Sequence, residues 1–228
     1  MNNDNSANLA ITPPTRIQQN FLARGERKLL NWICSRLPRW VTPDQLTSVG
    51  FAGAVMVAAG YMLSWLGGAW LALSLLGYVV NWFGDSLDGS LARWRGIERP
   101  SYGYFVDHSV DGMAIFLMVG GIGLSPYVRF DVALIGVVSY LLLAIHTFLA
   151  AKVMGEFRLS YMAGGPTEMR LMLMAMTALM PLVGTGDVGQ INFTPFDLFA
   201  LFIASILMTL FVVQSLATAR VLHRRDRG

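Results

Sequence analysis

The chain contains few charged residues and only one cysteine. Charged side chains make up 14% of its 228 residues, whereas a soluble domain carries about a quarter, so an ordinary soluble protein is disfavoured. Cys34 has no cysteine partner, which excludes an intramolecular disulfide and a multi-cysteine zinc cluster. Residues 1–15 lack a basic segment followed by an apolar one, and we therefore expect no cleaved signal peptide.

Long apolar runs dominate the sequence instead. Hydrophobic residues make up 54% of the chain, and an apolar run of about 20 residues can cross a hydrocarbon core as a helix. The alternation typical of a β-barrel is absent from the sequence. We predict an all-α integral membrane protein with six transmembrane helices, near residues 45–66, 70–94, 104–125, 130–154, 168–185 and 195–220.

The pattern divides the chain into four parts. Between residues 15 and 37, apolar residues such as Phe21 and Trp32 recur among basic ones at helical spacing, which predicts an amphipathic helix on the membrane surface. Thr42 followed by Pro43 is typical of a helix start. We expect a flexible N-terminus (1–14), an interfacial helix with its turn into the membrane (15–41), a six-helix transmembrane catalytic domain (42–222) and a basic cytoplasmic tail (223–228).

Basic residues are distributed unevenly between the predicted loops. Sixteen of the seventeen Lys and Arg residues fall on one side of the predicted spans, and Arg129 falls on the other. Because short loops rich in Lys and Arg remain in the cytoplasm, we predict that both termini and the active site are cytoplasmic, at the inner membrane if the protein is bacterial. The net charge of +3 follows from this asymmetry and indicates anionic lipid headgroups, not nucleic acid, as partners.

Four aspartates interrupt the apolar sequence of the second and third predicted spans. Asp85 and Asp88 are three residues apart, and Asp107 and Asp111 are four apart, so each pair occupies one face of a helix. A short connection makes the two helices antiparallel neighbours, so the four carboxylates can converge. Since clustered carboxylates repel one another unless a cation neutralises them, we predict a site for Mg²⁺ or Mn²⁺, with two ions that could clamp a diphosphate.

The segment that contains these aspartates, DSLDGSLARWRGIERPSYGYFVDHSVD at residues 85–111, resembles the signature of the CDP-alcohol phosphotransferase, or CDP-alcohol phosphatidyltransferase, family. That signature reads D-x2-D-G-x2-A-R, then a spacer of about eight residues, then G-x3-D-x3-D. Its fixed positions are filled by Asp85, Asp88, Gly89, Ala92, Arg93, Gly103, Asp107 and Asp111. The spacer, residues 94–102, is one residue longer than the commonest form, which indicates a change in a loop and not loss of the site.

The resemblance implies an enzyme that transfers a phosphoalcohol or phosphatidyl group from a CDP-linked donor to an acceptor hydroxyl and releases CMP. It also implies a homodimer, a lipid substrate, and two divalent ions held by the four aspartates. The residues expected to contact the nucleotide are Thr47, Asp88, Gly89, Ala92, Arg93 and Gly103. From the residues alone, the small side chains near the acids, including Gly84, serve either ligand approach or close helix packing.

The catalytic base is expected to be His108 or Asp111. Many family members use the last aspartate of the motif, whereas FVDHSVD resembles the FDHxxD pattern of the choline and ethanolamine phosphotransferase branch, in which the histidine is the proposed base. An imidazole suits proton abstraction at neutral pH, but a polar residue at a membrane boundary is also commonly a hydrogen-bonded fixture. The segment GPTE, residues 165–168, resembles the GPxE segment of the same branch, which would place Glu168 near the alcohol headgroup. Alternatively, Glu168 is only an acid in the first turn of a helix, where the helix dipole favours it.

These expectations leave the substrates open. The leading hypothesis is a CDP-aminoalcohol-like donor with a diacylglycerol-like acceptor. The alternative is a CDP-diacylglycerol-dependent phosphatidyltransferase that acts on a small alcohol or alcohol phosphate, for which Arg158 and Arg170 would supply positive charge. A divalent-cation transporter is the hypothesis from another class, since intramembrane carboxylates also mark ion pathways, but all four aspartates lie toward one face.

Overall fold

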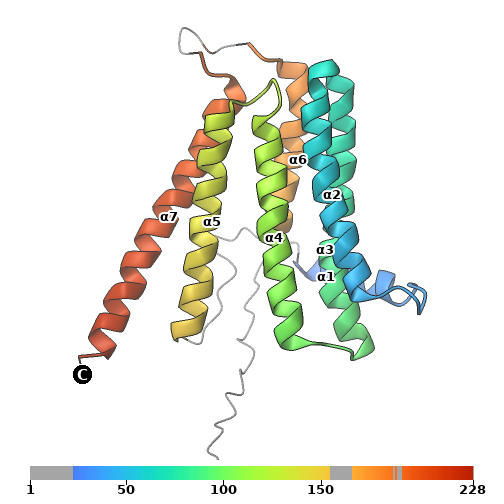
Figure 1. Ribbon diagram of the computed structural model, residues 1–228, viewed down its shortest axis with the longest axis vertical. Helices are drawn as coiled ribbons and strands as arrows, with labels where there is room; N and C mark the ends of the chain where they lie inside the picture. Colours follow the sequence, from blue (N-terminus) through green and yellow to red (C-terminus); the bar gives the residue numbers. More distant parts are fainter. Residues whose placement is uncertain (1–22, 155–165, 187, 189–191, 228) are drawn as a thin grey trace, which may run out of the picture.

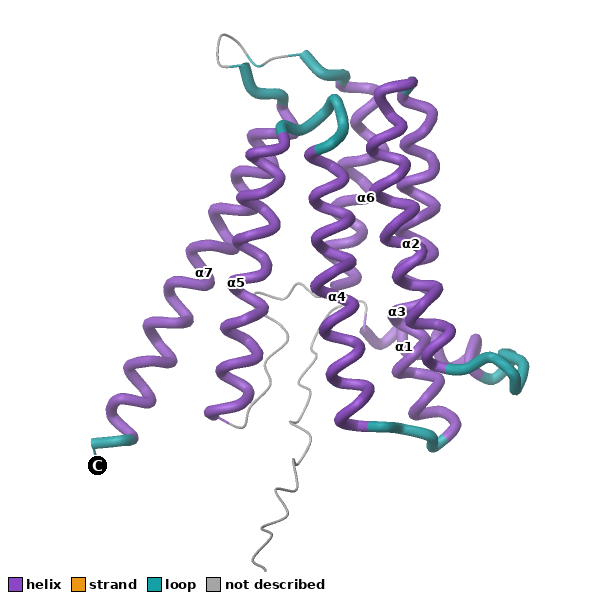
Figure 2. Tube along the Cα trace, viewed as in Figure 1, coloured by secondary structure: helices purple, strands orange, loops and turns teal. Residues whose placement is uncertain are grey.

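The structure is a computed structural model that describes residues 23–154, 166–186, 188 and 192–227. All regular structure in these residues is helical, as the sequence predicts (Figure 2). The α-helices are α1 (Ala23–Cys34), α2 (Pro43–Leu63), α3 (Leu71–Arg95), α4 (Pro100–Gly123), α5 (Phe130–Met154), α6 (Pro166–Val183) and α7 (Pro195–Arg225), and two 3-10 helices, η1 (Ser64–Leu66) and η2 (Gly68–Trp70), lie between α2 and α3. The predicted flexible N-terminus, the first part of the interfacial helix and Arg158 lie outside the described residues.

The six long helices α2 to α7 correspond to the six predicted spans and run alongside one another (Figure 1). Within the described residues, four segments are long and apolar enough to cross a membrane, namely residues 43–66, 100–123, 130–154 and 195–225. The other two helices fall short of that standard. Polar residues such as Asn81 and Asp85 lower the hydropathy of α3, and Glu168 and Arg170 lower that of α6. The integral membrane class therefore rests on four helices, and the count of six stays a prediction.

Glycines allow α2 and α3 to pack backbone against backbone. A Cβ atom at Gly84 would lie 2.2 Å from the backbone nitrogen of Gly50, and one at Gly53 would lie 2.3 Å from that of Asn81. Backbone atoms cannot move aside as the end of a flexible side chain can, so these positions require glycine. Gly84 consequently serves helix packing, which decides between its two expected roles. The close approach also sets the start of α2 against the aspartates of α3.

A short connection turns α3 back into α4. α3 ends at Arg95 and is capped by Gly96, whose φ of 64° is the left-handed conformation that glycine adopts most readily. Pro100 then occupies the first turn of α4, where its missing N–H is not needed. The two helices run in opposite directions (Figure 1), and the end of α3 faces the start of α4. The spacer of the motif therefore consists of the last turn of α3, this connection and the first turn of α4.

α1 packs against the end of α3 that is predicted to face the cytoplasm. Leu30 and Cys34 of α1 share a hydrophobic cluster with Leu87 and Leu91 of α3. Cys34 is 3% exposed, and burial raises the pKa of its thiol. The one cysteine of the chain is thus a packed and poorly reactive side chain.

The connection from α1 to α2 is held by side chains on both sides. Arg95, at the end of α3, donates hydrogen bonds to the backbone oxygens of Val41 at 2.5 Å and Pro38 at 2.9 Å. Thr42 then caps α2, because its hydroxyl accepts from Gln45 N at 3.3 Å while the Gln45 side chain accepts from Thr42 N at 2.9 Å. The predicted helix start at Thr42 is confirmed.

Basic residues gather at one end of the bundle. α3, α5 and α7 end there, and α4 begins there (Figure 1). The basic residues on these helix ends and on the connection from α3 to α4 are Arg93, Arg95, Arg99, Lys152, Arg220, Arg224 and Arg225. Arg129 precedes α5 in the connection at the opposite end. Among these residues, the structure therefore preserves the asymmetry that the sequence predicts.

Candidate active site

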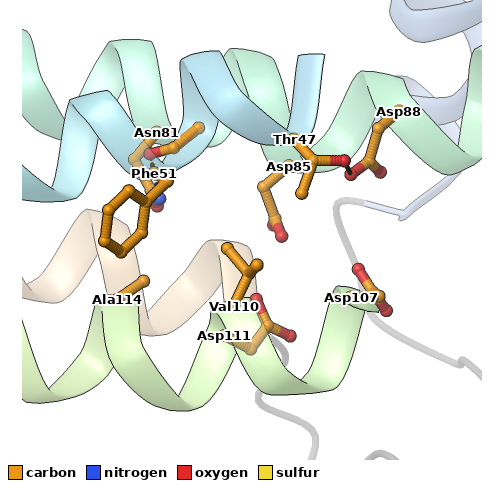
Figure 3. Close-up of a pocket in the computed structure, with 10 residues that line it drawn as sticks. Thr47, Phe51, Asn81, Asp85, Asp88, Asp107, Val110, Asp111 and Ala114 are labelled. Carbon is orange, nitrogen blue, oxygen red and sulfur yellow. Dashed lines mark hydrogen bonds between the residues drawn. The ribbon is translucent and has the colours of Figure 1, made fainter. Parts of the chain in front are cut away.

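A small pocket lies between α2, α3 and α4, and all four aspartates of the motif line it (Figure 3). Asp85 and Asp88 come from α3, and Asp107 and Asp111 come from α4. The remaining lining residues are Thr47, Gly50 and Phe51 of α2, Asn81 of α3, and Val110 and Ala114 of α4. The structure thus brings together the two aspartate pairs whose spacing placed each on one helix face.

Asp88 is held between α2 and its own helix. Its Oδ2 atom accepts a hydrogen bond from the hydroxyl of Thr47 at 2.6 Å, and its Oδ1 atom accepts from Gly89 N at 2.5 Å. Thr47 was expected near the nucleotide, and the structure shows that it contacts one of the expected metal ligands. Asp88 is 9% exposed as a residue, so these two donors fix the orientation of a nearly buried side chain.

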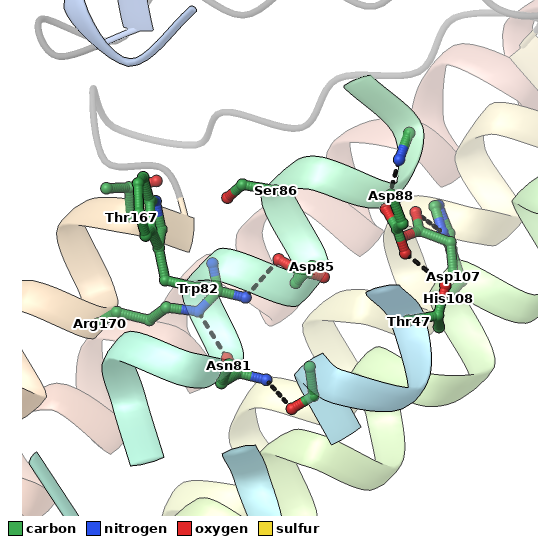
Figure 4. Close-up of polar contacts among 12 residues, drawn as sticks. Thr47, Asn81, Trp82, Asp85, Ser86, Asp88, Asp107, His108, Thr167 and Arg170 are labelled. Carbon is green, nitrogen blue, oxygen red and sulfur yellow. Dashed lines mark hydrogen bonds and ion pairs between the residues drawn. The ribbon is translucent and has the colours of Figure 1, made fainter. Parts of the chain in front are cut away.

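Asp85 forms an ion pair with a residue far along the chain. Arg170, in the second turn of α6, donates from Nη2 to Asp85 Oδ2 at 2.5 Å and from Nε to Asn81 Oδ1 at 2.9 Å (Figure 4). Asn81 in turn donates to Gly50 O at 2.9 Å. The side chains of Arg170 and Asp85 are only 12% and 23% exposed, and a charge-assisted pair in such surroundings is stronger than one at a surface. Arg170, expected to meet the acceptor, therefore lies at the aspartate site itself.

Asn81 is a site residue that the sequence reasoning missed. Its position four residues before Asp85 puts both side chains on one face of α3. A polar side chain within an apolar helix usually faces the interior of a bundle. Those two signals together would have marked Asn81 as part of the site.

His108 lies beside the pocket and contacts Asp107. Its Nδ1 atom is 3.1 Å from Asp107 Oδ2, and its ring packs against those of Tyr104 and Phe148, at centroid distances of 4.2 and 5.0 Å. The described residues that line the pocket include Asp111 but not His108. Asp111 therefore faces the pocket directly, whereas His108 lies beside it and contacts Asp107.

The donor atoms of the pocket fit a hard divalent cation. One potential ligand atom from each of Asp107, His108 and Asp111 lies within 4.8 Å of the others, and Asp85 and Asp88 face them across the pocket (Figure 3). Carboxylate oxygens are the ligands that Mg²⁺ and Mn²⁺ prefer. The space enclosed between these side chains is only about 10 Å³, about what one water molecule occupies by this measure, and the pocket opens to the solvent. A larger ligand must extend beyond it.

The residues expected to contact the nucleotide differ in what surrounds them. A Cβ atom at Gly103 would meet nothing within 4 Å, and one at Gly89 would meet only the guanidinium of Arg93, at 3.2 Å. Ala92 is partly buried, and Arg93 donates to Ser90 Oγ at 3.3 Å. Gly89 and Gly103 thus leave open surface next to the acids, as ligand approach requires. Their contact with a nucleotide stays a prediction.

Glu168 lies in the first turn of α6, where an acid is favoured by the helix dipole. It is partly buried, and it is not among the described residues that line the pocket. The helix-start explanation therefore accounts for its position, and a contact with a headgroup stays a prediction.

Comparison with known proteins gives the family. Residues 40–223 match the family model described as CDP-alcohol phosphatidyltransferase, and they include all four aspartates. The chain is 33% identical over 101 residues to the archaetidylinositol phosphate synthase of Pyrococcus horikoshii, which covers 43% of this chain and 50% of that protein. It is 35% identical over 103 residues to the phosphatidylinositol phosphate synthase of Cutibacterium acnes, which covers 44% and 46%. The matches span about half the length of these curated relatives, whereas the family match extends over most of this chain, and the chain therefore belongs to the CDP-alcohol phosphatidyltransferase family.

Proposed function

We propose that the protein transfers a phosphatidyl-type group from a CDP-linked lipid to the hydroxyl of a small alcohol phosphate, with release of CMP. The observation that carries the proposal is the convergence of both aspartate pairs on one pocket beside the Arg170 guanidinium. The two relatives, which are named as synthases of inositol phosphate lipids, support an acceptor such as an inositol phosphate. The aminoalcohol donor, which was the leading hypothesis from the sequence, has less support than this alternative.

The four aspartates would hold two divalent ions, Mg²⁺ or Mn²⁺. Bound ions would clamp the diphosphate of the donor and stabilise the attacking and leaving oxygens. Asp85 and Asp88 would hold them from α3, and Asp107 and Asp111 from α4. Thr47 would keep Asp88 in its ligating orientation, because its hydroxyl is 2.6 Å from that carboxylate.

Asp111 would accept the proton of the acceptor hydroxyl. The acceptor oxygen then forms a bond to the phosphorus that carries the lipid, the bond from that phosphorus to the oxygen of CMP breaks, and CMP leaves with the electron pair. Direct access to the pocket supports this role for Asp111, and the 3.1 Å contact supports a role for His108 in orienting Asp107. Proton transfer to a positioned carboxylate of this kind typically accelerates a reaction by about 10²–10⁴.

Charge at the site favours a phosphorylated acceptor over a cationic one. Two divalent ions would offset the four carboxylates, and Arg170 would then add a positive charge next to the pocket. A phosphate on the acceptor is attracted to that charge, whereas an ammonium group is repelled. Arg158, the second residue expected in this role, lies outside the described residues and keeps it as a prediction.

The six-span topology with a cytoplasmic site belongs to the same proposal. Basic residues at the end of the bundle where α4 begins, with Arg129 at the other end, support it. Single cysteines in a Cys34→Ser background test it: a membrane-impermeant reagent should label Arg129→Cys from outside the cell and Glu98→Cys only after lysis. The reverse pattern would contradict the orientation. Homodimerisation stays a prediction from family resemblance, which mass measurement in detergent would test.

A substrate screen tests the proposed reaction. Purified protein in lipid with Mn²⁺ should release CMP from CDP-diacylglycerol only when inositol phosphate is added, and less readily with unphosphorylated inositol. CDP-choline with diacylglycerol should give no CMP. CMP release from CDP-choline would restore the aminoalcohol hypothesis. If no donor gives CMP and the protein carries Mn²⁺ into liposomes, the protein is a divalent-cation transporter and not an enzyme.

A further inference from the structure

A single carboxylate joins three helices next to the site. Glu26, in the first turn of α1, accepts hydrogen bonds at Oε1 from Trp82 Nε1 at 2.8 Å, from Thr167 Oγ1 at 2.9 Å and from Ser86 Oγ at 3.4 Å. Trp82 and Ser86 belong to α3, and Thr167 belongs to α6. Hydrogen bonds to an ionised acceptor are about twice as strong as those between neutral groups, so this oxygen is a firm point of attachment.

The attachment lies one helical turn from the Arg170–Asp85 ion pair on both helices. Trp82 precedes Asp85 by three residues on α3, and Thr167 precedes Arg170 by three residues on α6. Residues three apart share a helix face, and Figure 4 shows Trp82 and Thr167 near Arg170 along the seam between α3 and α6. Whatever holds Thr167 against α3 therefore also sets the distance between Arg170 and Asp85.

We infer that Glu26 is a positioning residue of the site, which fastens the first turn of α6 to α3 and so holds the Arg170 guanidinium on Asp85. The inference rests on the aspartate pocket as a divalent-cation site, as proposed above. It assigns a task to α1 beyond lying on a membrane: the helix supplies the acceptor that fixes a charge in the pocket.

The attachment is expected to weaken cation binding at Asp85. While Arg170 is held on Asp85, its positive charge opposes a divalent cation at the same carboxylate. Loss of the attachment lets the first turn of α6 move and the guanidinium leave Asp85 for part of the time. Cations should then bind more tightly, even though the site is less ordered. General damage to the pocket would weaken binding, so the direction of the change separates the two causes.

The test is a titration of the purified full chain with Mn²⁺, followed by electron paramagnetic resonance and without substrate. Removing the charge in Arg170→Gln should tighten Mn²⁺ binding by about tenfold, given the strength of charge interactions at this range. Thr167→Val removes one donor without changing charge or volume, and it should tighten binding by about two- to fivefold in the same direction.

Variants of Glu26 separate the attachment from the charge of the carboxylate. Glu26→Ala should tighten Mn²⁺ binding, although losing a negative charge alone would weaken it. Glu26→Gln loses the same charge but keeps an oxygen acceptor for Trp82 and Thr167, so it should not tighten Mn²⁺ binding and should bind as the wild type does or slightly more weakly. Asn31→Ala, an uncharged change at an exposed position of α1, is the control and should leave Mn²⁺ binding unchanged.

Two results would overturn the inference. If Thr167→Val and Glu26→Ala bind Mn²⁺ as the wild type does, or more weakly, the attachment does not set the position of Arg170. If Glu26→Gln behaves as Glu26→Ala does, the oxygen acceptor is not the group that matters. Because no substrate is present, both results stand apart from the identity of donor and acceptor. A wild type that fails to bind Mn²⁺ would instead reject the metal site and the inference with it.

Discussion

Each end of the bundle contains buried aspartates, but their carboxylates obtain hydrogen-bond donors in different ways. At the end away from the motif, Asp197 is fully buried at the start of α7. Its two oxygens accept from Arg129 N at 2.7 Å and from Thr194 N at 2.8 Å. Both donors are backbone groups of the connections that meet there, and they would otherwise lack a helical partner. Backbone N–H groups therefore satisfy both oxygens of Asp197, which joins the two connections and has a structural task.

The aspartates of the motif lie within helices, where backbone N–H groups are already used by the helix. Their partners are mainly side chains: Thr47 of α2 for Asp88, Arg170 of α6 for Asp85 and the adjacent His108 for Asp107. Asp88 also accepts from the backbone N–H of Gly89. These partners leave four carboxylates facing one pocket. The comparison teaches that an acid at a helix start can be satisfied by free backbone N–H groups, whereas acids in mid-helix take most of their partners from side chains.

The largest expected effect is the loss of turnover in Asp111→Asn. An amide can neither accept the proton nor bring a negative charge to the cation, so CMP release should fall by at least about a thousandfold. The fold should persist, because removing one of several clustered like charges relieves repulsion. Cys34, which is 3% exposed, offers a direct check, since a thiol-reactive dye should report the same thermal midpoint as for the wild type. Turnover above a tenth of the wild-type rate would remove Asp111 from the base role.

At the other end of the bundle, substitution of Asp197 is expected to lower stability without lowering turnover. Asp197→Ala leaves the backbone N–H groups of Arg129 and Thr194 without their acceptor, at a cost of about 2 kcal/mol. For a chain of this size that corresponds to a fall of about 4–8 °C in the thermal midpoint, read from the exposure of Cys34. Turnover per folded molecule should not change. Asp131→Asn, at a neighbouring exposed acid, is the control and should melt as the wild type does. Loss of turnover in folded Asp197→Ala would break the distinction between the two ends.

The sequence predicted the parts of the site that depend on local spacing. The i, i+3 and i, i+4 positions of the aspartates, with a short connection, were sufficient to predict that they meet, and the pattern at Thr42 predicted a helix start. It could not predict that Arg170 pairs with Asp85, because the two are 85 positions apart and no local pattern links them. For the same reason Glu26, whose partners come from α3 and α6, was not recognised.

The packing of α2 on α3 shows a second limit of prediction from the sequence. Small residues near the acids were compatible with ligand approach and with close helix contact, and composition alone could not decide between them. The structure separates them by what a Cβ atom would meet: backbone at Gly84 and open space at Gly103. The neighbours that a glycine faces depend on the tertiary structure. The sequence therefore could not separate the packing glycines from those next to open space.

The smallest expected effect concerns His108, whose substitution tests which of the two candidate residues is the base. If the imidazole orients Asp107 through its 3.1 Å contact, His108→Ala should lower turnover by about tenfold, comparable to the loss of one outer-shell partner of a metal ligand. His108→Gln, which can still donate to Asp107, should recover part of that loss. The pH dependence of turnover should keep the shape of the wild type, because the group that accepts the proton is unchanged. A loss as large as in Asp111→Asn, with no recovery in His108→Gln and a changed pH profile, would make His108 the base, since only a group that accepts the proton controls that profile.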